Sequence, residues 1–360
     1  MPSLVPVFLG ALGFYAGALH AETTEIEAIR GRHQLPALAV LAAKDGKILE
    51  QLATGVRKSG DDAEARRDDP FHLGSCTKAM TATLAGILVD EGSIGWDTSI
   101  AEVFPKLAKK MQPDYRAVTL DQLLHNRGGV PTEPPPDAWE EAWKERGSPR
   151  KQRLRFIEAV LAQPPAAPPG TRHVYSNSGF AIAGAMLEER ADLPWEELIT
   201  KKLFRPLGMT TAGFGPPGKK GKSDAPWGHE RTADGLVPRW SDNPPAIAPA
   251  GRVHASLADF ARFALLHADG SKLLKPATLE HLHQPAEGGD YACGWRVLKR
   301  DWAGGTALTH NGSNTFWYAV VWIAPARHAV FIAATNVAGE AAEKACDEAI
   351  SLMIGKWLQD

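Results

Sequence analysis

The chain has few cysteines and almost no net charge, and both features limit the classes of protein to which it can belong. Its 360 residues include three cysteines, Cys76, Cys293 and Cys346, which cannot all pair. Their wide separation gives neither a disulfide framework nor a metal-binding spacing. The formal charge is −2, with Lys and Arg interspersed among Asp and Glu, so nothing indicates a nucleic-acid or anionic-membrane partner. The 44% hydrophobic content predicts one large core or two closely packed domains.

Long apolar runs are also missing beyond the N-terminus. Residues 1–21 form an uncharged apolar stretch that ends in small residues before Glu22 and resembles a secretory signal peptide. We therefore expect a periplasmic or secreted protein. The alternative is an uncleaved N-terminal membrane anchor, although the stretch is short for a spanning helix and contains Pro6 and His20. We expect no other integral membrane segment.

One short motif points directly to a chemistry. The segment Ser75-Cys76-Thr77-Lys78 follows a glycine and opens an apolar helical run. Residues three apart share a helix face, which predicts contact between the side chains of Ser75 and Lys78. A serine hydroxyl is a poor nucleophile until a base takes its proton, and an uncharged lysine can act as that base. The alternative is a serine that caps an ordinary helix, with Lys78 in solvent.

Two later segments carry polar side chains suited to the same cleft. Tyr175-Ser176-Asn177 follows a Pro-Pro-Gly turn, and its phenol and carboxamide are two residues apart, so an extended segment points both the same way. His310-Asn311-Gly312-Ser313 ends a strand-like stretch, and Gly312 leaves room for a ligand at a strand edge. Each segment alone is weak evidence for a catalytic cleft, but the three segments in this order are specific evidence.

Taken together, the segments resemble the three motifs of the serine β-lactamase and penicillin-binding-protein superfamily. The chain keeps S-x-x-K and has Tyr-Ser-Asn and His-Asn-Gly where class A enzymes have S-D-N and K-T-G. This pattern is similar to the class C-like branch of carboxylesterases, D-Ala-D-Ala carboxypeptidases and class C β-lactamases. The resemblance covers nearly all of residues 30–355, including Leu123–Gly129, Tyr175–Phe180, Phe204–Met209, Pro249–Gly251 and Ser256–Phe263.

The resemblance implies a role for each motif residue. Ser75 would be acylated, Lys78 and Tyr175 would share the proton transfer, and Asn177 would bind the acyl side of the substrate. Gly312 and Ser313 follow His310, and the backbone N–H groups of Ser313 and Ser75 would form the oxyanion hole. No metal or cofactor is expected, and the class A deacylating motif Glu-x-x-Leu-Asn is missing from the sequence.

The histidine at position 310 is a departure, because many relatives carry lysine there. A histidine is mostly neutral at pH 7 and gives a substrate carboxylate no fixed positive charge. Among the other reactive side chains, Cys76 projects away from Lys78 and is expected to pack as a small apolar residue. His281 and His283 are expected at the surface, without a carboxylate or cysteine that would complete a zinc site.

The expected fold class is α+β. The resemblance implies a beta-lactamase/transpeptidase-like, antiparallel five-stranded-type sheet flanked by helices, with an inserted mostly helical region. Residue patterns predict strands at 37–43, 48–54, 292–298, 306–310, 317–323 and 329–335, and helices at 257–267 and 340–358. We expect a sheet domain from residues 22–96 and 246–360, and a helical region over residues 97–245.

These observations favour a serine hydrolase that acts through an acyl-enzyme on esters or small D-amino-acid peptides and amides. A class C-type β-lactamase or a penicillin-binding DD-peptidase is the alternative within the superfamily. From another class, a non-catalytic binding or sensor protein on the same scaffold would require Lys78 or Tyr175 to be displaced. The expected partner is a small-molecule or peptide substrate.

Overall fold

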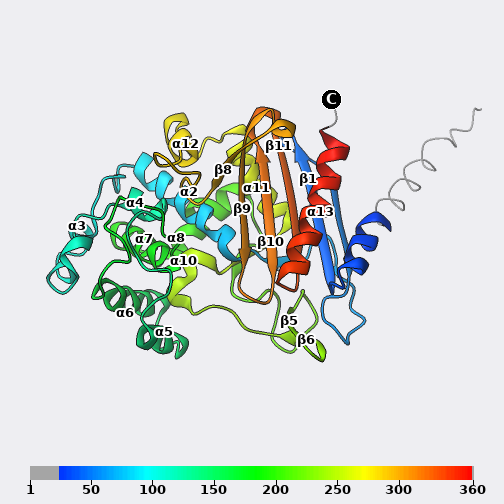
Figure 1. Cartoon of the computed structure of the whole chain (residues 1–360), viewed down its shortest axis with the longest axis horizontal. Helices are drawn as coiled ribbons and strands as arrows, with labels where there is room; N and C mark the ends of the chain where they lie inside the picture. Colours follow the sequence, from blue (N-terminus) through cyan, green and yellow to red (C-terminus); the bar gives the residue numbers. More distant parts are fainter. Residues whose placement is uncertain (1–23, 359–360) are drawn as a thin grey trace, which may run out of the picture.

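A six-stranded antiparallel sheet forms the centre of the computed structural model, which describes residues 24–358 (Figure 1). The strand order is β2-β1-β11-β10-β9-β8, so the first two strands of the chain join the last four. The strands of this sheet are β1 (Ala37–Lys44), β2 (Lys47–Gly55), β8 (Arg296–Arg300), β9 (Gly305–Ser313), β10 (Tyr318–Ala324) and β11 (Ala329–Thr335).

Both faces of the sheet are covered by helices. Helix α13 (Glu340–Trp357) packs on one face and α11 (Leu257–Asp269) on the other, and Figure 1 shows the sheet between them. Strands β1 and β11 are accordingly buried along almost their whole length and consist largely of Ala, Val, Leu and Ile. A strand covered on both sides reads as an apolar run rather than as an alternating pattern.

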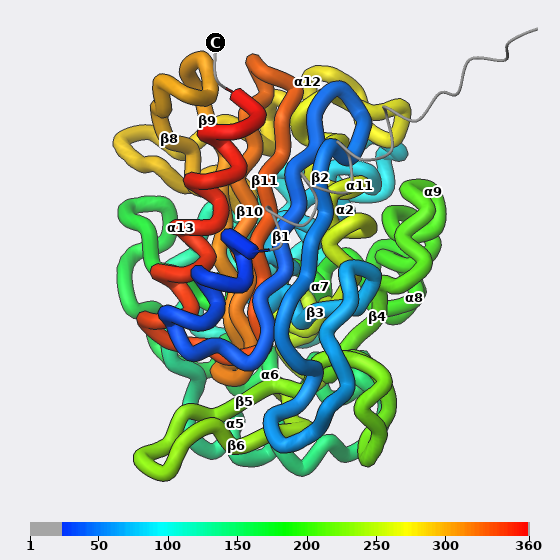
Figure 2. Tube along the Cα trace, turned by 90° about the vertical axis from the view of Figure 1, so that its right-hand side faces the viewer, coloured from blue at the N-terminus to red at the C-terminus, as the bar shows by residue number. Residues whose placement is uncertain are grey.

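The beta-lactamase/transpeptidase-like fold class is confirmed, but the sheet has six strands rather than five. The strands predicted at 37–43 and 48–54 are present as the hairpin of β1 and β2, and Figure 2 shows it beside the late strands. The strand predicted at 292–298 instead begins at Arg296, because Gly294, at φ +77°, lies in a turn that breaks it. Short-range patterns place strands well but do not detect such turns.

The remaining helices lie mostly on the α11 side of the sheet, where they share the larger hydrophobic core. They are α2 (Thr77–Asp90), α3 (Ile100–Val103), α4 (Leu120–Leu124), α5 (Pro136–Trp143), α6 (Pro149–Leu161), α7 (Asn177–Ala191), α8 (Trp195–Ile199), α9 (Arg205–Leu207), α10 (Ala248–Gly251) and α12 (Pro276–His283). A smaller core lies between the sheet, α13 and a helix over residues 24–32.

Residues 97–245, expected to be a mostly helical region, also contain strand β4 (Gly213–Phe214) and the hairpin of β5 (Gly228–Thr232) and β6 (Gly235–Arg239). Strand β4 joins β3 (Pro70–His72) through β7 (Val253–Ser256) in a small sheet. The proposed division into domains stays a prediction.

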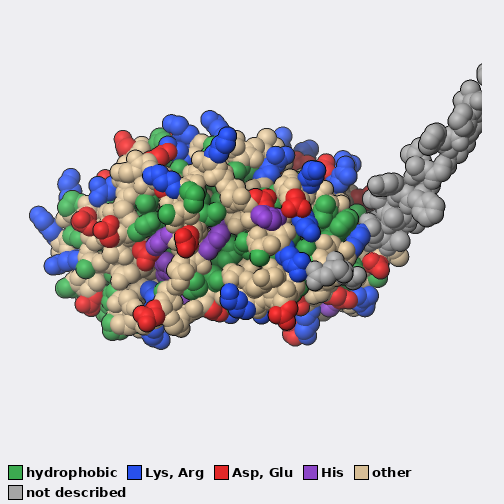
Figure 3. Space-filling model, turned by 90° about the horizontal axis from the view of Figure 1, so that it is seen from above, with side chains coloured by type: hydrophobic (Ala, Val, Ile, Leu, Met, Phe, Trp, Pro, Cys, Tyr) green, Lys and Arg blue, Asp and Glu red, His purple; other side chains and the backbone are tan. Residues whose placement is uncertain are grey.

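The distribution of surface charge and the hydropathy of the helices agree with the nearly neutral composition and the lack of long apolar runs. Figure 3 shows basic and acidic side chains interspersed over the face seen from above. Within residues 24–358, no helix is both long enough and apolar enough to cross a membrane. The predicted signal segment, residues 1–21, lies outside the described part of the chain.

Candidate active site

Ser75 lies in a tight turn that leads directly into a helix buried along most of its length. The turn is a 3-10 helix, η1 (Gly74–Cys76), and α2 begins two residues after Ser75. Lys78 is therefore in the first turn of α2, and its Nζ lies 3.1 Å from Ser75 Oγ. The structure brings this predicted pair together.

The Lys78 amine is enclosed by three oxygen atoms. Besides Ser75 Oγ, its Nζ lies 2.7 Å from Asn177 Oδ1 and 2.9 Å from the carbonyl oxygen of Ala250. The side chain is fully buried, and this burial lowers the pKa of Lys78 to about 7. An uncharged amine has two N–H groups and one lone pair. The Asn177 and Ala250 oxygens can accept the two hydrogens, which leaves the lone pair for the Ser75 hydroxyl.

Tyr175 reaches the same point from the segment before α7. Its ring centroid is 4.7 Å from Lys78 Nζ. Burial raises the pKa of Tyr175 to about 12, although a hydrogen bond with Ser75 acts in the opposite direction. The phenol is therefore protonated at neutral pH. Asn177, two residues later, is the first residue of α7 rather than part of an extended segment, because Ser176 caps the helix by accepting from Gly179 N at 3.0 Å.

Asn126 is a supporting residue that the sequence did not reveal. Its side-chain Oδ1 accepts from Ser176 N at 3.0 Å, and its backbone oxygen accepts from Val174 N at 2.7 Å. The two neighbours of Tyr175 are thus held by one residue, which has a left-handed backbone with φ +55°. The Leu123–Gly129 segment that carried part of the family resemblance contains Asn126, but its link to position 175 is visible only in three dimensions.

Two glycines allow close contact between the two backbone segments of the predicted oxyanion hole. A Cβ at Gly312 would lie 2.5 Å from Ser75 N, and a Cβ at Gly74 would lie 2.3 Å from Ser313 N. Gly74 also has φ +49°, a conformation that favours glycine. The two backbone segments that carry the predicted N–H donors are therefore in such close contact that no side chain fits between them.

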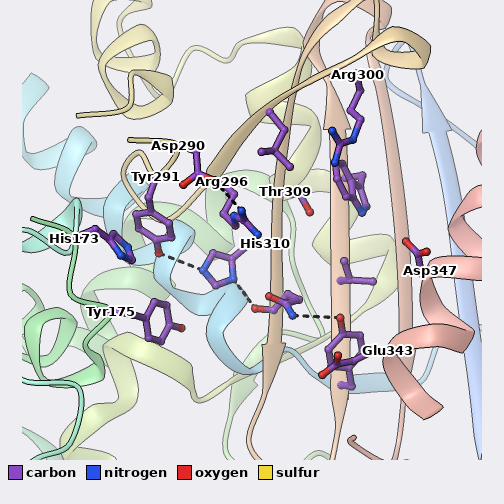
Figure 4. Close-up of a pocket in the computed structure, with 15 residues that line it drawn as sticks. His173, Tyr175, Asp290, Tyr291, Arg296, Arg300, Thr309, His310, Glu343 and Asp347 are labelled. Atoms are coloured by element: carbon purple, nitrogen blue, oxygen red, sulfur yellow. Dashed lines mark hydrogen bonds and ion pairs between the residues drawn. The ribbon is translucent and has the colours of Figure 1, made fainter. Parts of the chain in front are cut away.

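His310 lies beside this contact, where β9 extends past its neighbour. Strand β8 pairs with β9 only from Gly305 to Thr309, so the stretch from His310 to Ser313 has β10 alone as a strand partner. His310 Nε2 lies 3.2 Å from Tyr291 Oη, and Nδ1 lies 2.5 Å from the Asn311 oxygen (Figure 4). Burial lowers the pKa of His310 to about 3, so the ring is neutral.

A cavity of about 550 Å³ opens on this side of Tyr175 and His310. It contains charges of both signs. Arg296, on its wall, forms an ion pair with Asp290 at 2.8 Å. Of the four tryptophans between residues 295 and 322, Trp322 lines the cavity and Trp302 packs against the Trp322 ring, whereas Trp295 and Trp317 are fully buried in the core. Ser75 is not among the residues that line this cavity.

Two expectations about the remaining side chains had different outcomes. Cys76 is buried as expected, with its Sγ 3.5 Å from the His310 oxygen, and burial raises the pKa of its thiol to about 12. The expectation that His281 lies apart from carboxylates was wrong, because its Nε2 is 2.8 Å from Asp121 Oδ1. His283 is also not free at the surface, since it contacts His267 Nδ1 at 2.9 Å. Residues 121 and 281 are too distant in sequence for a spacing argument to connect them.

Comparison with known proteins shows which family and fold the chain shares. A family model described as Beta-lactamase matches residues 23–352. Penicillin-binding protein 4 of Amycolatopsis lactamdurans is 28% identical over 335 residues, which cover 88% of this chain and 85% of that protein. Lovastatin esterase of Penicillium rubens is 28% identical over 198 residues, 49% of each chain. A solved class C beta-lactamase superposes with a TM-score of 0.78 at 16% identity, covering 95% of this chain and 96% of that one.

Substituting Gly312 by alanine tests the close packing of the two backbones. The new Cβ would lie 2.1 Å from the Leu73 oxygen, so the chains must separate. We expect Gly312→Ala to lower the free energy of unfolding by about 1–3 kcal/mol, as overpacking does. Gly355→Ala is the control, because a Cβ there meets nothing within 4 Å and the site is inside α13. Urea denaturation measures both, and equal stability of the two variants would contradict the contact.

Proposed function

This chain belongs to the beta-lactamase family of serine hydrolases, and from that membership we propose that it hydrolyses esters or small D-amino-acid peptides and amides through an acyl-enzyme on Ser75. The observation that carries the proposal is the 3.1 Å contact between Lys78 Nζ and Ser75 Oγ, with both other amine contacts made to oxygens that can only accept. A buried amine whose lone pair is free can take the proton of the serine hydroxyl, and this activates Ser75 as a nucleophile.

Acylation follows from this arrangement. The Ser75 oxygen attacks the carbonyl carbon while its proton passes to Lys78 Nζ, and the backbone N–H groups of Ser75 and Ser313 receive the negative charge on the carbonyl oxygen. The tetrahedral intermediate then expels the leaving group, which must gain a proton. Tyr175 is suited to donate it, because its hydroxyl hydrogen-bonds Ser75 and stays protonated at neutral pH. The Lys78 ammonium then gives the proton it took from Ser75 to the Tyr175 phenolate, which returns both groups to their starting forms.

Deacylation repeats the sequence with water as the nucleophile. Water attacks the acyl carbon, Ser75 Oγ leaves, and the proton lost by water ends on the serine. The chain lacks the class A deacylating motif, so Lys78 and Tyr175 are the groups left to move this proton. The lysine acts first as base and then as acid, which requires a pKa near the working pH, and burial supplies that pKa.

The neutral ring at position 310 supports esters and uncharged amides over carboxylate-bearing substrates. The similarity to a lovastatin esterase agrees with an ester substrate. A β-lactamase or penicillin-binding peptidase is the second candidate, favoured by similarity to penicillin-binding protein 4 over most of both chains. A non-catalytic binding protein is disfavoured, since neither Lys78 nor Tyr175 is displaced from Ser75.

We also propose a periplasmic or secreted location, with membrane anchoring by an uncleaved N-terminus as the alternative. This part rests only on the apolar composition of residues 1–21. The proposed partner is a small-molecule or peptide substrate.

Replacing the nucleophile tests the proposal directly. We expect Ser75→Ala to lose more than about 10⁴-fold in kcat on a p-nitrophenyl ester, because no other group forms the acyl-enzyme. Trapping the wild-type protein in acid during turnover, followed by peptide mass spectrometry, should show an acyl adduct on the peptide that contains Ser75. Ser351→Ala, exposed on α13, is the control and should keep full activity. Undiminished turnover in Ser75→Ala would refute the assignment.

The rate should rise with pH as Lys78 loses its proton. Since only the uncharged amine accepts the serine proton, kcat/KM should be low in acid and reach half its maximum near pH 7, the value to which burial lowers the pKa. Lys78→Arg keeps the charge permanently, so we expect a loss of roughly 10²–10⁴-fold and no rising limb. Exposed Lys110→Arg should leave the profile unchanged. A wild-type profile that stays flat into the acidic range would contradict this role.

Adding a positive charge at position 310 tests substrate preference. We expect His310→Lys to raise kcat/KM for a carboxylate-bearing cephalosporin roughly tenfold relative to a neutral p-nitrophenyl ester, the effect of one charge-assisted hydrogen bond. His310→Gln, which stays neutral, should give no such gain. If the lysine variant leaves the ratio of the kcat/KM values for the two substrates unchanged, charge at this position does not limit carboxylate recognition.

A further inference from the structure

A cluster of metal-binding side chain types lies behind the active site and has no part in the proposed reaction. Asp121 is in α4, His125 follows that helix directly, and Cys293 lies in the turn before β8. One ligand-type atom from each lies within 4.8 Å of the other two. His281, from α12, contacts the Asp121 carboxylate at 2.8 Å. Three separate parts of the chain therefore bring two imidazoles, a thiol and a carboxylate together.

The hydrogen bonds of His125 leave one ring nitrogen beside the two Asp121 oxygens and the Cys293 sulfur. Nε2 lies 3.0 Å from the Gln284 oxygen, which can accept its hydrogen. Nδ1 lies 3.0 Å from the backbone oxygen of Asp121, 3.2 Å from Asp121 Oδ1 and 3.7 Å from Cys293 Sγ. With Nε2 as the donor, the Nδ1 lone pair lies beside the two Asp121 oxygens, which only accept, and the Cys293 sulfur is within reach at the side of the ring. A proton or a metal ion at Nδ1 would satisfy these oxygens.

The spacing of these atoms suits a metal ion. Zinc binds sulfur at about 2.3 Å and nitrogen or oxygen at about 2.0–2.1 Å, which in a tetrahedron separates neighbouring ligand atoms by about 3.3–3.6 Å. The distances from His125 Nδ1 to Asp121 Oδ1 and to Cys293 Sγ, 3.2 and 3.7 Å, lie on either side of that range. The sulfur is also 3.8 Å from Nε2, so it lies beside the ring, and the Cys293 side chain must turn toward Nδ1 to share an ion with it.

Charge, burial and access agree with the same interpretation. Cys293 is fully buried and His125 nearly so, while the Asp121 and His281 side chains are about one-third exposed, which leaves a route from solvent. A carboxylate and a thiolate carry two negative charges, which a divalent cation balances in this interior position. A metal-ligating histidine commonly donates its second N–H to a backbone carbonyl, as His125 does to Gln284.

We propose that Asp121, His125 and Cys293 bind one divalent transition-metal ion, with zinc the ion that this mixed sulfur, nitrogen and oxygen ligand set favours. His125 binds through Nδ1 and Cys293 as the thiolate. His281 donates to Asp121 and orients its carboxylate, and water occupies the fourth position on the exposed side.

Such an ion would join the two segments that support the catalytic residues. Asn126, next to His125, holds the backbone on both sides of Tyr175. Gly294, next to Cys293, packs so closely on α2 that a Cβ there would lie 2.6 Å from Ala79 N, directly after Lys78. The ion therefore has a structural role, fixing the Tyr175 support against the Lys78 helix.

Cobalt substitution tests this site independently of enzyme activity. The purified chain is treated with a chelator, dialysed and titrated with Co²⁺, whose thiolate complexes absorb in the near ultraviolet. We expect a thiolate-to-cobalt band that saturates at one ion per chain and is displaced by Zn²⁺. Cys293→Ser should lose the band, whereas Cys346→Ser, which removes another fully buried cysteine, should keep it. His281→Gln should weaken Co²⁺ binding by roughly 10–100-fold, as loss of an orienting partner does.

Each outcome decides the proposal. A wild-type protein that gives no thiolate band, and no zinc by elemental analysis after refolding with Zn²⁺, would overturn it and leave His125 as a protonated ring among its acceptors. A band of equal strength in Cys293→Ser would also overturn it. If Cys293→Ser does not fold, as judged by circular dichroism, the wild-type band and its weakening in His281→Gln decide instead.

Discussion

The site depends on a lysine that the fold keeps out of water. An ammonium group at Lys78 would lose its hydration inside the core, and the three oxygen contacts offset only part of that loss, so burial shifts the amine toward its uncharged form. Helix α2, the turn at Gly74 and the α10 segment that contributes Ala250 are arranged around this one group. Rigid packing is what the chemistry requires, since a few water molecules beside Nζ would restore the charge.

Local sequence patterns predicted most of the elements but few of the links between them. The β1–β2 hairpin, the late strands and helices α11 and α13 follow from runs of apolar residues, and the Ser75–Lys78 contact follows from helical spacing. The role of Asn126 does not follow from such patterns, because its partners are about fifty residues away. The same holds for Ala250 and for the pairing of Asp121 with His281, since long-range contacts leave no periodic trace in the sequence.

The neutral ring of His310 adjoins a cavity that carries charges of both signs. His310 is buried in strand β9, and this burial opposes protonation of its ring. The lining of the cavity beyond it includes side chains of both signs, Arg296, Arg300, Asp290, Glu343 and Asp347. The charges on this side are therefore mixed rather than of one sign.

The thiol immediately after the proposed nucleophile has a practical meaning for chemical labelling. Cys76 is turned toward a backbone oxygen of β9 and keeps its hydrogen well above neutral pH, so alkylating reagents that consume thiolates find nothing to react with there. The Cys76 side chain is therefore inert toward these reagents. An electrophilic probe designed for activated hydroxyls would thus mark residue 75 without a competing signal from the adjacent sulfur.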